Sequence, residues 1–353
     1  MIASSDNSKI NRDLAKYIYL ERERFFPLGK IFRQIFPNLN NPFLSIKRRP
    51  LMIICETVNI CNNDCVICAH NKMTRKKETM PLEIFEKVLQ DYSDMGGGRL
   101  SLTPMIGDIF LDKFLIERLE LLSQYPKITG LSVTTNAIGS DIFNDKELKF
   151  IIEKFERFHI SIYGLDVEEY KIMTRRSYYP RMIKNVKKII KLSGGKQNIL
   201  IGFRFLKNHT ISDIKKWIQQ NFECEIPFNF TNSYSNWGNV LDTQKKLPLD
   251  GVWLPTPDNK EQCLIPLFAF QIFSNGNVSF CPCPDYNGIE ELKLGNVAKD
   301  HLLDIYNSKK CQELWNFNTK VPDFCKKCSF FKPLSELPQY ENAVINPLEF
   351  IGG

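Results

Sequence analysis

Short apolar runs alternate with amphipathic stretches through the middle of this chain. The apolar runs have the length of buried strands and lie at 51–55, 100–103, 130–135, 158–162, 199–205 and 228–231. Between them, hydrophobic residues recur at helical spacing at 82–92, 113–123, 145–155, 183–192 and 211–220. Strands that alternate with helices are typical of βα units on a parallel sheet. The pattern therefore predicts an α/β fold, a partial (β/α)6 TIM-like barrel with its active site at the carboxyl ends of the strands.

The regions on either side of this pattern have a different character. Residues 1–49 form a leader with a helical pattern at 14–26 and a short basic amphipathic segment at 30–36. We expect the leader to pack on the outside of the barrel; the alternative is a surface that docks on a membrane or a polymer-bound substrate. The predicted domains are an N-terminal helical leader, a barrel, a linker, a small cysteine-rich domain and a C-terminal tail, at 1–49, 50–235, 236–262, 263–330 and 331–353.

Three cysteines follow the first predicted strand directly. They are Cys61, Cys65 and Cys68, with C-x3-C-x2-C spacing. A loop at a strand end would present their thiolates to one point. Three thiolates are one fewer than a cubane [4Fe–4S] cluster normally takes, so one iron would be free to bind another ligand. The alternative is a zinc site, but zinc sites are usually built from C-x2-C pairs with four protein ligands.

A second group of cysteines lies near the C-terminus. Its members are Cys263, Cys281, Cys325 and Cys328. The sequence 275–277, Asn-Gly-Asn between two apolar segments, predicts a β-hairpin that ends near Cys281. A hairpin cysteine and a distant C-x2-C pair can close a four-thiolate site, which suits either zinc or an iron–sulfur cluster.

Composition narrows the class of protein. The chain has 353 residues, of which 43% are hydrophobic and 25% charged, as in ordinary soluble globular proteins. A net charge of +7 is a mild excess that does not by itself indicate a nucleic-acid partner. Eleven cysteines, mostly in two groups, favour metal ligands in a reducing compartment over a disulfide scaffold. Since residues 1–13 are polar and no apolar run is long enough to span a bilayer, we expect a cytoplasmic protein with no signal peptide and no transmembrane segment.

Further motifs fall at the ends of later predicted strands: GDIF at 107–110, TTNA at 134–137 and SIYG at 161–164. Together with the C-x3-C-x2-C loop, they resemble the glycine–acidic, TNG and S-[ILV]-D-G motifs of the radical S-adenosylmethionine (SAM) superfamily. Two positions depart from the family pattern. Asp108 replaces a glutamate and no proline follows it, and Tyr163 stands where relatives that act on peptides often have aspartate.

The resemblance implies a radical chemistry that depends on SAM. SAM would bind the iron that lacks a cysteine. One electron, from a flavodoxin- or ferredoxin-type donor, would release a 5′-deoxyadenosyl radical that abstracts hydrogen from a small-molecule or peptide substrate. Gly107 would permit close backbone approach, Asp108 would hold the SAM ammonium, and Asn136 would contact the ribose or the adenine edge.

Other candidate residues lie on the fourth and fifth predicted strands and between them. Ser161, with Arg175 or Arg176, would hold the SAM carboxylate. Arg204 is a charge inside an apolar strand, and a buried arginine must be paired. We therefore expect it to face the barrel interior and bind an anionic group. Tyr163 is a candidate catalytic residue.

Residues 263–328 resemble the auxiliary-cluster domains of the same superfamily, named SPASM when full length and twitch when shortened. The full domain continues with two more cysteines, but 329–353 contains none. The resemblance thus implies one auxiliary [4Fe–4S] cluster, and a structural zinc ribbon is the alternative. Its ligands would be Cys263, Cys281, Cys325 and Cys328.

The remaining cysteines are Cys55, Cys224, Cys283 and Cys311. We expect Cys55 and Cys224 to be packed as small hydrophobic residues. Cys283 lies between two prolines, two residues after a cluster ligand. It is a candidate alternative ligand, a candidate hydrogen-atom donor to a substrate radical, or a spare thiol.

Three classes of function are open. The favoured one is a radical SAM oxidoreductase that dehydrogenates a carbohydrate, aminocyclitol or related small alcohol, with the auxiliary cluster as electron acceptor. The second is a peptide-modifying maturation enzyme or epimerase. We expect residues 1–49 to be too short for the winged peptide-binding domain common in that branch. The third is a non-enzymatic zinc or iron–sulfur scaffold, which SAM cleavage by the reduced protein would exclude.

Overall fold

The computed structural model describes residues 50, 52–195, 198–257, 263, 265–267, 269–315 and 321–332. The helix predicted at 14–26 and the predicted tail after residue 332 lie outside this part of the chain. None of the helices within it is long and apolar enough to cross a membrane.

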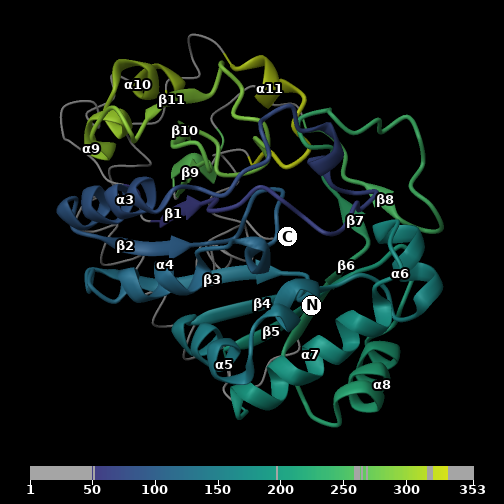
Figure 1. Cartoon of the computed structure of the whole chain (residues 1–353). Helices are drawn as coiled ribbons and strands as arrows, with labels where there is room; N and C mark the ends of the chain where they lie inside the picture. Colours follow the sequence, from purple (N-terminus) through teal and green to yellow (C-terminus); the bar gives the residue numbers. More distant parts are fainter. Residues whose placement is uncertain are drawn as a thin grey trace, which may run out of the picture.

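The six predicted strands are all present and form consecutive parallel neighbours (Figure 1). They are β1 Met52–Cys55, β2 Gly98–Ser101, β3 Ile128–Thr135, β4 Arg157–Ile162, β5 Ile199–Arg204 and β6 Phe228–Thr231. Their register keeps strand ends together: in β4 and β5, for example, Phe158 pairs with Ile199 and Ile162 with Phe203. The prediction of a partial α/β barrel is therefore confirmed.

The five predicted helices are present as well. They are α3 Leu82–Asp94, α4 Leu115–Leu122, α5 Asp145–Lys154, α7 Tyr179–Ser193 and α8 Ile211–Phe222. α5 and α8 begin at capping boxes, in which Asn144 and Thr210 accept from the backbone three residues later. α7 begins four residues before its predicted start, with a proline in its first turn.

One helix of the barrel was not predicted. α6 spans Val167–Thr174 and follows β4. Four of its eight residues are apolar, but they are spread around the helix rather than gathered on one face, so the hydrophobic pattern gives little sign of it. Its capping sequence was the available signal, because Asp166 accepts from the backbone N–H of Glu169.

Short 3-10 helices follow the first three strands on the side where the motifs lie. They are η2 Ala69–Lys72, η3 Ile109–Leu111 and η4 Ile138–Ile142. After β6 the chain forms a small parallel ladder of β7 Ser233–Tyr234 with β8 Val252–Trp253.

The cysteine-rich region extends the barrel sheet beyond β1. β9 Ala269–Ile272 runs parallel to β1, and β10 Asn277–Ser279 returns antiparallel to it, as the predicted hairpin requires. With β11 Lys293–Asn296, β9 and β10 extend the barrel strands into one nine-stranded sheet in the order β11-β10-β9-β1-β2-β3-β4-β5-β6. The other elements here are η5 Ile265–Leu267, α9 Leu302–Tyr306, α10 Lys309–Trp315 and α11 Asp323–Lys326. The predicted domain boundaries stay a prediction.

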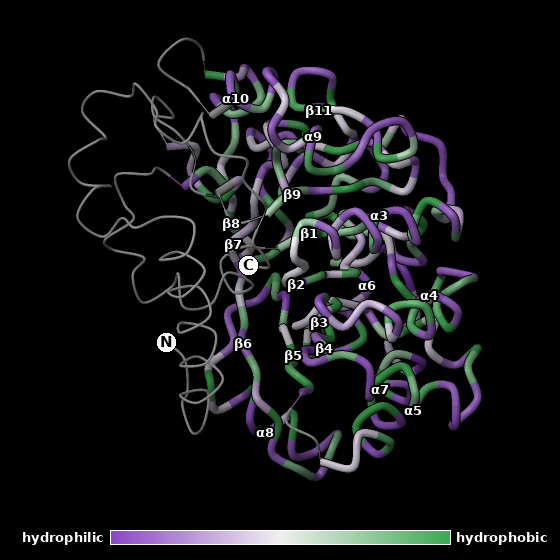
Figure 2. The backbone as a smooth tube through the Cα atoms, turned by 90° about the vertical axis from the view of Figure 1, so that its left-hand side faces the viewer, coloured by the Kyte–Doolittle hydropathy of each residue, from purple (hydrophilic) through white to green (hydrophobic). Residues whose placement is uncertain are grey.

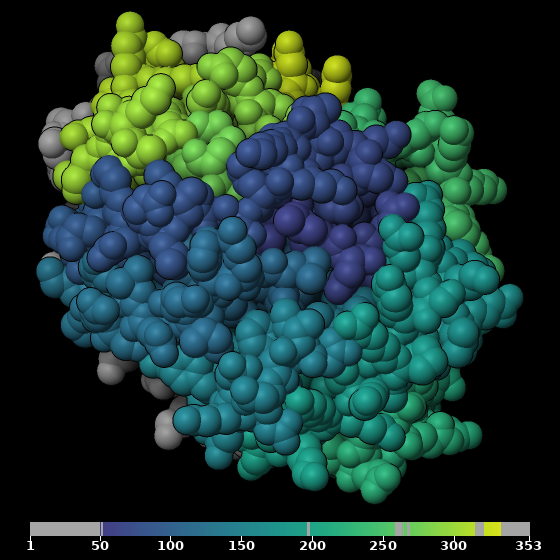
Figure 3. Space-filling view, in the orientation of Figure 1, coloured from purple at the N-terminus to yellow at the C-terminus, as the bar shows by residue number. Residues whose placement is uncertain are grey.

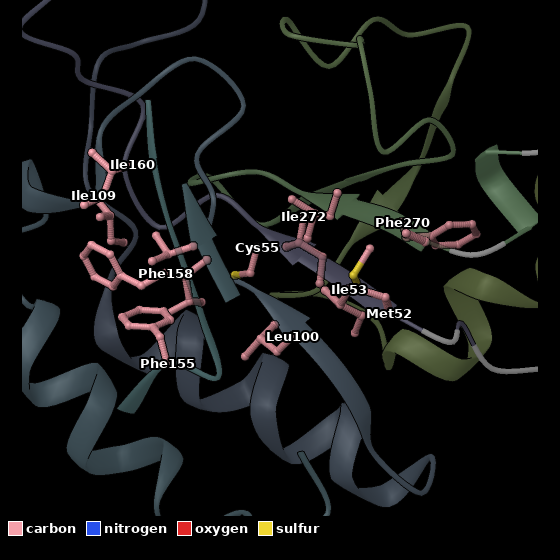
Figure 4. Packing of buried hydrophobic residues seen from close by; sticks show 14 of the residues in the cluster. Met52, Ile53, Cys55, Leu100, Ile109, Phe155, Phe158, Ile160, Phe270 and Ile272 are labelled. Carbon is pink, nitrogen blue, oxygen red and sulfur yellow. The ribbon is translucent and has the colours of Figure 1, made fainter. Parts of the chain in front are cut away.

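The hydrophobic core lies between the sheet and its helices. In β4, Phe158, Ile160 and Ile162 are fully buried, and Phe158 packs against Phe155 with ring centroids 5.7 Å apart (Figure 4). Because strand side chains alternate, His159 and Ser161 lie on the opposite face. Hydrophilic and hydrophobic residues alternate along the helices (Figure 2). This alternation is typical of helices that pack one apolar face against a sheet.

Candidate functional site

The loop after β1 carries the first three cysteines, and we call residues 56–68 the cluster loop. Burial raises the pKa of all three thiols, that of Cys68 to about 11. Three ionised sulfurs in one buried place would repel one another, so a positively charged partner is needed to hold them as thiolates. This donor chemistry fits an iron–sulfur cluster.

α6 holds the cluster loop from one side. The backbone N–H groups of Asp64 and Val66 donate to the carbonyls of Thr174 and Met173, at 3.1 and 2.8 Å. The hydroxyl of Tyr170 lies 3.4 Å from Asn63 Oδ1. The helix that the hydrophobic pattern did not predict therefore fixes the backbone on both sides of Cys65.

Asp108 is buried, and groups of the protein occupy its carboxylate. It accepts from the N–H of Phe110, the hydroxyl of Thr135 and the N–H of Asn136, the last at 2.7 Å. Burial raises the pKa of Asp108 to about 6, and these bonds limit the rise. The carboxylate thus ties the end of β3 to the loop after β2, and its predicted contact with the SAM ammonium stays a prediction.

Asn136 faces the cluster loop directly. Its Nδ2 donates to Asn62 Oδ1 at 2.8 Å and lies 3.7 Å from Cys61 Sγ, while its Oδ1 accepts from the N–H of Ile138. The amide therefore positions the first cysteine. The predicted contact with the ribose or adenine edge is not tested by this arrangement.

We expect Asp108→Asn to lower the free energy of unfolding by about 1–3 kcal/mol, because an amide group would then face N–H donors in a buried place. Urea unfolding under anaerobic conditions measures this change. Asp250→Asn is the control, since Asp250 is exposed and its carboxylate accepts from Asn208 at 3.3 Å. Unchanged stability with SAM bound about 10- to 100-fold more weakly would show instead that the carboxylate meets the SAM ammonium.

Gly107 permits a close approach between the second strand end and the cluster loop. A Cβ on this residue would lie 2.5 Å from the carbonyl oxygen of Val58. The neighbouring N–H of Asp108 donates to the carbonyl of Ile60 at 2.9 Å. In this structure Gly107 therefore allows the backbone of the cluster loop to approach closely. Its predicted contact with SAM stays a prediction.

Ser161 and Arg175 flank the cluster loop differently. Ser161 is buried near the end of β4. Arg175 caps the C-terminus of α6 with a positive φ of 54°, and its half-exposed side chain pairs with Asp64 at 3.6 Å. Arg175 therefore lies at the outer side of the loop, beside a carboxylate of the chain itself. Their predicted roles at the SAM carboxylate stay predictions.

Tyr163 follows β4 and Arg204 ends β5, and these two strands are neighbours in the sheet. Burial raises the pKa of Tyr163, with smaller contributions from Cys65 and Cys61. The positive charge of Arg204 opposes this rise, and it also opposes the rise that burial causes in the pKa of Cys283, to about 12. Since electrostatic effects fall with distance, Arg204 lies near Tyr163 and near Cys283.

Glu169 is a residue of this region that the sequence did not reveal. It is fully buried in α6, and its Oε1 accepts from the N–H groups of Leu206 and Lys207, both at 2.8 Å. Its Oε2 accepts from the N–H of Leu165 and lies 2.8 Å from His209 Nε2. One carboxylate therefore positions the chain just after Tyr163 and just after Arg204.

The second cysteine group lines one cavity together with Cys283 and aromatic side chains. The cysteines are Cys263, Cys281, Cys283, Cys325 and Cys328. Within Cys325–Cys328, the second N–H donates to the first carbonyl at 3.2 Å, and the equivalent bond of Cys65–Cys68 is 3.1 Å. The two C-x2-C segments thus share a local backbone geometry.

Among the described residues, no set of three or more His, Cys, Asp or Glu side chains converges as ligands of a single metal ion. In a cubane cluster each thiolate binds a different iron, so the sulfurs stand further apart than around one zinc ion. Such an arrangement is compatible with a cluster at either site.

A buried ion pair joins the cluster loop to the cysteine-rich region. Arg75 donates to both oxygens of Glu56, at 2.7 and 3.0 Å, and to the carbonyl of Tyr286. Its guanidinium lies 4.2 Å from the ring centroid of Phe273. In the space-filling view, the residues coloured purple to blue lie against the green to yellow C-terminal part (Figure 3).

The fold and the site define an α/β-barrel protein with two cysteine groups suited to iron–sulfur clusters. Residues 55–218 match the family model of the radical SAM superfamily, and residues 263–329 match that of the SPASM iron–sulfur cluster-binding domain. The chain belongs to the radical SAM superfamily. These families imply three kinds of cofactor: a [4Fe–4S] cluster that binds SAM, auxiliary iron–sulfur clusters in the SPASM region, and SAM itself.

Curated relatives match only in part. A probable GTP 3′,8-cyclase of Pyrococcus abyssi is 27% identical over 180 residues, which cover 49% of this chain and 56% of that protein. A protein with the same description from Methanothermobacter marburgensis is 25% identical, with coverages of 49% and 55%. The chain thus spans about half the length of the curated relatives it matches.

Solved structures share the fold across most of the chain. BtrN in complex with AdoMet and 2-DOIA has a TM-score of 0.54 at 18% identity, covering 80% of this chain and 94% of that one. Streptococcus suis SuiB bound to the precursor peptide SuiA has a TM-score of 0.56 at 16% identity, with coverages of 93% and 90%. anSMEcpe with bound AdoMet and the Cp18Cys peptide scores 0.53 at 16% identity, with coverages of 79% and 86%.

Proposed function

We propose that this radical SAM enzyme is an oxidoreductase that dehydrogenates a carbohydrate, an aminocyclitol or a related small alcohol. The observation that carries the proposal is the single cavity formed by Cys263, Cys281, Cys325 and Cys328. We propose that this cavity holds one auxiliary [4Fe–4S] cluster. One such cluster near the substrate is the acceptor that an oxidation requires.

Bound SAM and its cluster supply a 5′-deoxyadenosyl radical. Oxidation of an alcohol then requires that its C–H bond gives up a hydrogen atom, its O–H bond a proton and the remaining carbon radical one electron, which leaves a carbonyl group. The chain must orient that hydroxyl and accept its proton. Arg204 and Tyr163 are the residues we propose to orient the substrate, because Glu169 accepts from the backbone N–H two residues after each of them.

Modification of a peptide is the second candidate. SuiB and anSMEcpe structures hold peptides, and their likeness to this chain covers its barrel and its cysteine-rich region. That likeness is one of fold, and Tyr163 departs from the aspartate common in peptide-modifying relatives. The match to probable GTP 3′,8-cyclases covers about half of the chain, so we do not extend their substrate to it.

We further propose that a flavodoxin- or ferredoxin-type protein donates the activating electron and that the enzyme works in the cytoplasm. Reduced thiols are needed in both cysteine groups, and none of the eleven cysteines forms a disulfide bond in this structure. A reducing compartment keeps them so.

Anaerobic reconstitution with iron, sulfide, dithionite and SAM tests the proposed function. With 2-DOIA and a panel of other aminocyclitols and polyols as probes, we expect one carbonyl product for each 5′-deoxyadenosine released. Mass spectrometry of both products measures the ratio. The proposal fails if 5′-deoxyadenosine forms with no oxidised alcohol from any probe while an added peptide panel is modified.

A further inference from the structure

The chain just after β7 contacts the auxiliary C-x2-C segment through Asn236. The Nδ2 of Asn236 donates to the carbonyl of Lys327, which lies between Cys325 and Cys328, at 2.8 Å. Its backbone N–H donates to Ser329 Oγ at 2.8 Å, and its Oδ1 accepts from the N–H of Ser329 at 3.1 Å. Asn236 is 1% exposed, so these bonds form in a buried place. The side chain of Asn236 therefore holds the auxiliary C-x2-C segment at two points, at Lys327 between the two cysteines and at Ser329 directly after them.

The next residue makes the matching contact with the cluster loop. The indole Nε1 of Trp237 donates to the carbonyl of Ile67 at 2.8 Å. Ile67 occupies the same place between Cys65 and Cys68 that Lys327 occupies between its two cysteines. The ring of Trp237 also packs edge-on against Tyr286, with centroids 6.2 Å apart. Two adjacent residues therefore hold equivalent carbonyls of the two C-x2-C segments.

The backbone here is strained in a way that brings the two contacts about. Trp237, Gly238 and Asn239 all have positive φ, at 53°, 67° and 71°. A positive φ is unusual for a bulky residue and is kept only where the surroundings enforce it. Gly238 could not carry a Cβ without meeting the ring of Phe324, at 2.2 Å, and Phe324 lines the auxiliary cavity. Contacts at both ends therefore hold this turn in its conformation.

We propose that residues 236–238, the bridging turn, fix the two iron–sulfur sites in position relative to each other. Trp237 and Asn236 are positioning residues that act through the carbonyls of Ile67 and Lys327. Because the turn is short and buried at its auxiliary end, a shift at one C-x2-C segment is passed to the other. The inference rests on the two clusters and not on the substrate proposed above, so it can fail while that proposal stands.

The bridging turn is tested by changing one iron–sulfur site and measuring a property of the other, which we call a cross-effect. The measurements use the reconstituted full chain. Ser329→Ala removes the hydroxyl that accepts from Asn236, at the auxiliary end. We expect it to raise the dissociation constant of SAM about fivefold, the value of one hydrogen bond. Trp237→Phe removes the bond at the cluster-loop end. We expect it to change the electron paramagnetic resonance spectrum of the auxiliary cluster, recorded alone in a background with Cys61, Cys65 and Cys68 replaced by alanine.

Trp253→Phe is the matched control, because its indole also donates to a carbonyl at 2.8 Å, that of Lys245, in the β7–β8 region. It should leave both measurements unchanged. If a variant lowers the iron content, iron lost from the cluster at the opposite end of the turn counts as the same cross-effect. The proposal is overturned if each variant alters only the site at its own end, or if the Trp253 variant has equal effects.

Discussion

Replacement of Cys61, Cys65 and Cys68 by alanine together should remove about half of the bound iron and abolish SAM cleavage. Two cubane clusters require about eight irons per chain, and the three thiols of the cluster loop supply one of them. The change leaves the auxiliary cavity intact, because none of its lining residues is altered. Iron analysis and the yield of 5′-deoxyadenosine, both under anaerobic conditions, measure the two effects.

Cys224→Ala is the control for this experiment. Cys224 follows α8 and belongs to neither cysteine group, so its removal should change neither iron content nor SAM cleavage. A protein purified without oxygen that contains stoichiometric zinc and no iron would contradict the assignment of both sites. Iron reduced to near zero in the triple variant would mean that the auxiliary site depends on the first cluster.

The barrel could be predicted because its information is local. Each strand is an apolar run such as Phe158–Ile162, and each long helix shows apolar residues at helical spacing, so six strands and five helices follow from the pattern. α6 was missed because this prediction depends on local hydrophobic periodicity. It is short and buries Glu169, whose partners lie near residue 206 and cannot be found by periodicity.

Local sequence patterns also identified which residues belong to the site. They did not reveal how the side chains of these residues contact one another. The cysteine spacing identified both groups, and the resemblance of 107–110 and 134–137 to family motifs pointed to strand ends. No pattern indicated that Asp108 would bind Thr135 and the N–H of Asn136 rather than face outward. These bonds join residues 27 and 28 positions apart, and they depend on how two strand ends meet in the fold.

The position of the cysteine-rich region was likewise beyond the sequence pattern. The turn at 275–277 predicted a hairpin, but nothing local shows that β9 pairs in parallel with β1. That pairing brings the auxiliary cavity beside the barrel. The contacts of Trp237 and Asn236 are also long-range, since they span 170 and 91 positions of sequence. Long-range pairing therefore decides how the two iron–sulfur sites are joined.

A dehydrogenase and an epimerase make opposite demands on the auxiliary region of this enzyme. Oxidation must pass an electron from the substrate radical to an acceptor, whereas epimerisation must return a hydrogen atom to carbon. The auxiliary cluster would serve the first reaction, and the thiol of Cys283 would serve the second. Both lie at one cavity, since Cys283 lines it and its carbonyl accepts from Cys281 Sγ at 2.8 Å.

We expect oxidation, and therefore that Cys283→Ala leaves product formation largely intact. Replacement of both Cys325 and Cys328 by alanine should stop turnover even where SAM is still cleaved, because the acceptor is lost. Product yield per 5′-deoxyadenosine, measured for both variants with the alcohol probe that the wild type oxidises, separates the two roles. The opposite result has its own signature. If the reaction inverts a carbon, Cys283→Ala should stall it, and product made by the wild type in deuterated water should carry one deuterium at that carbon with no change of oxidation level.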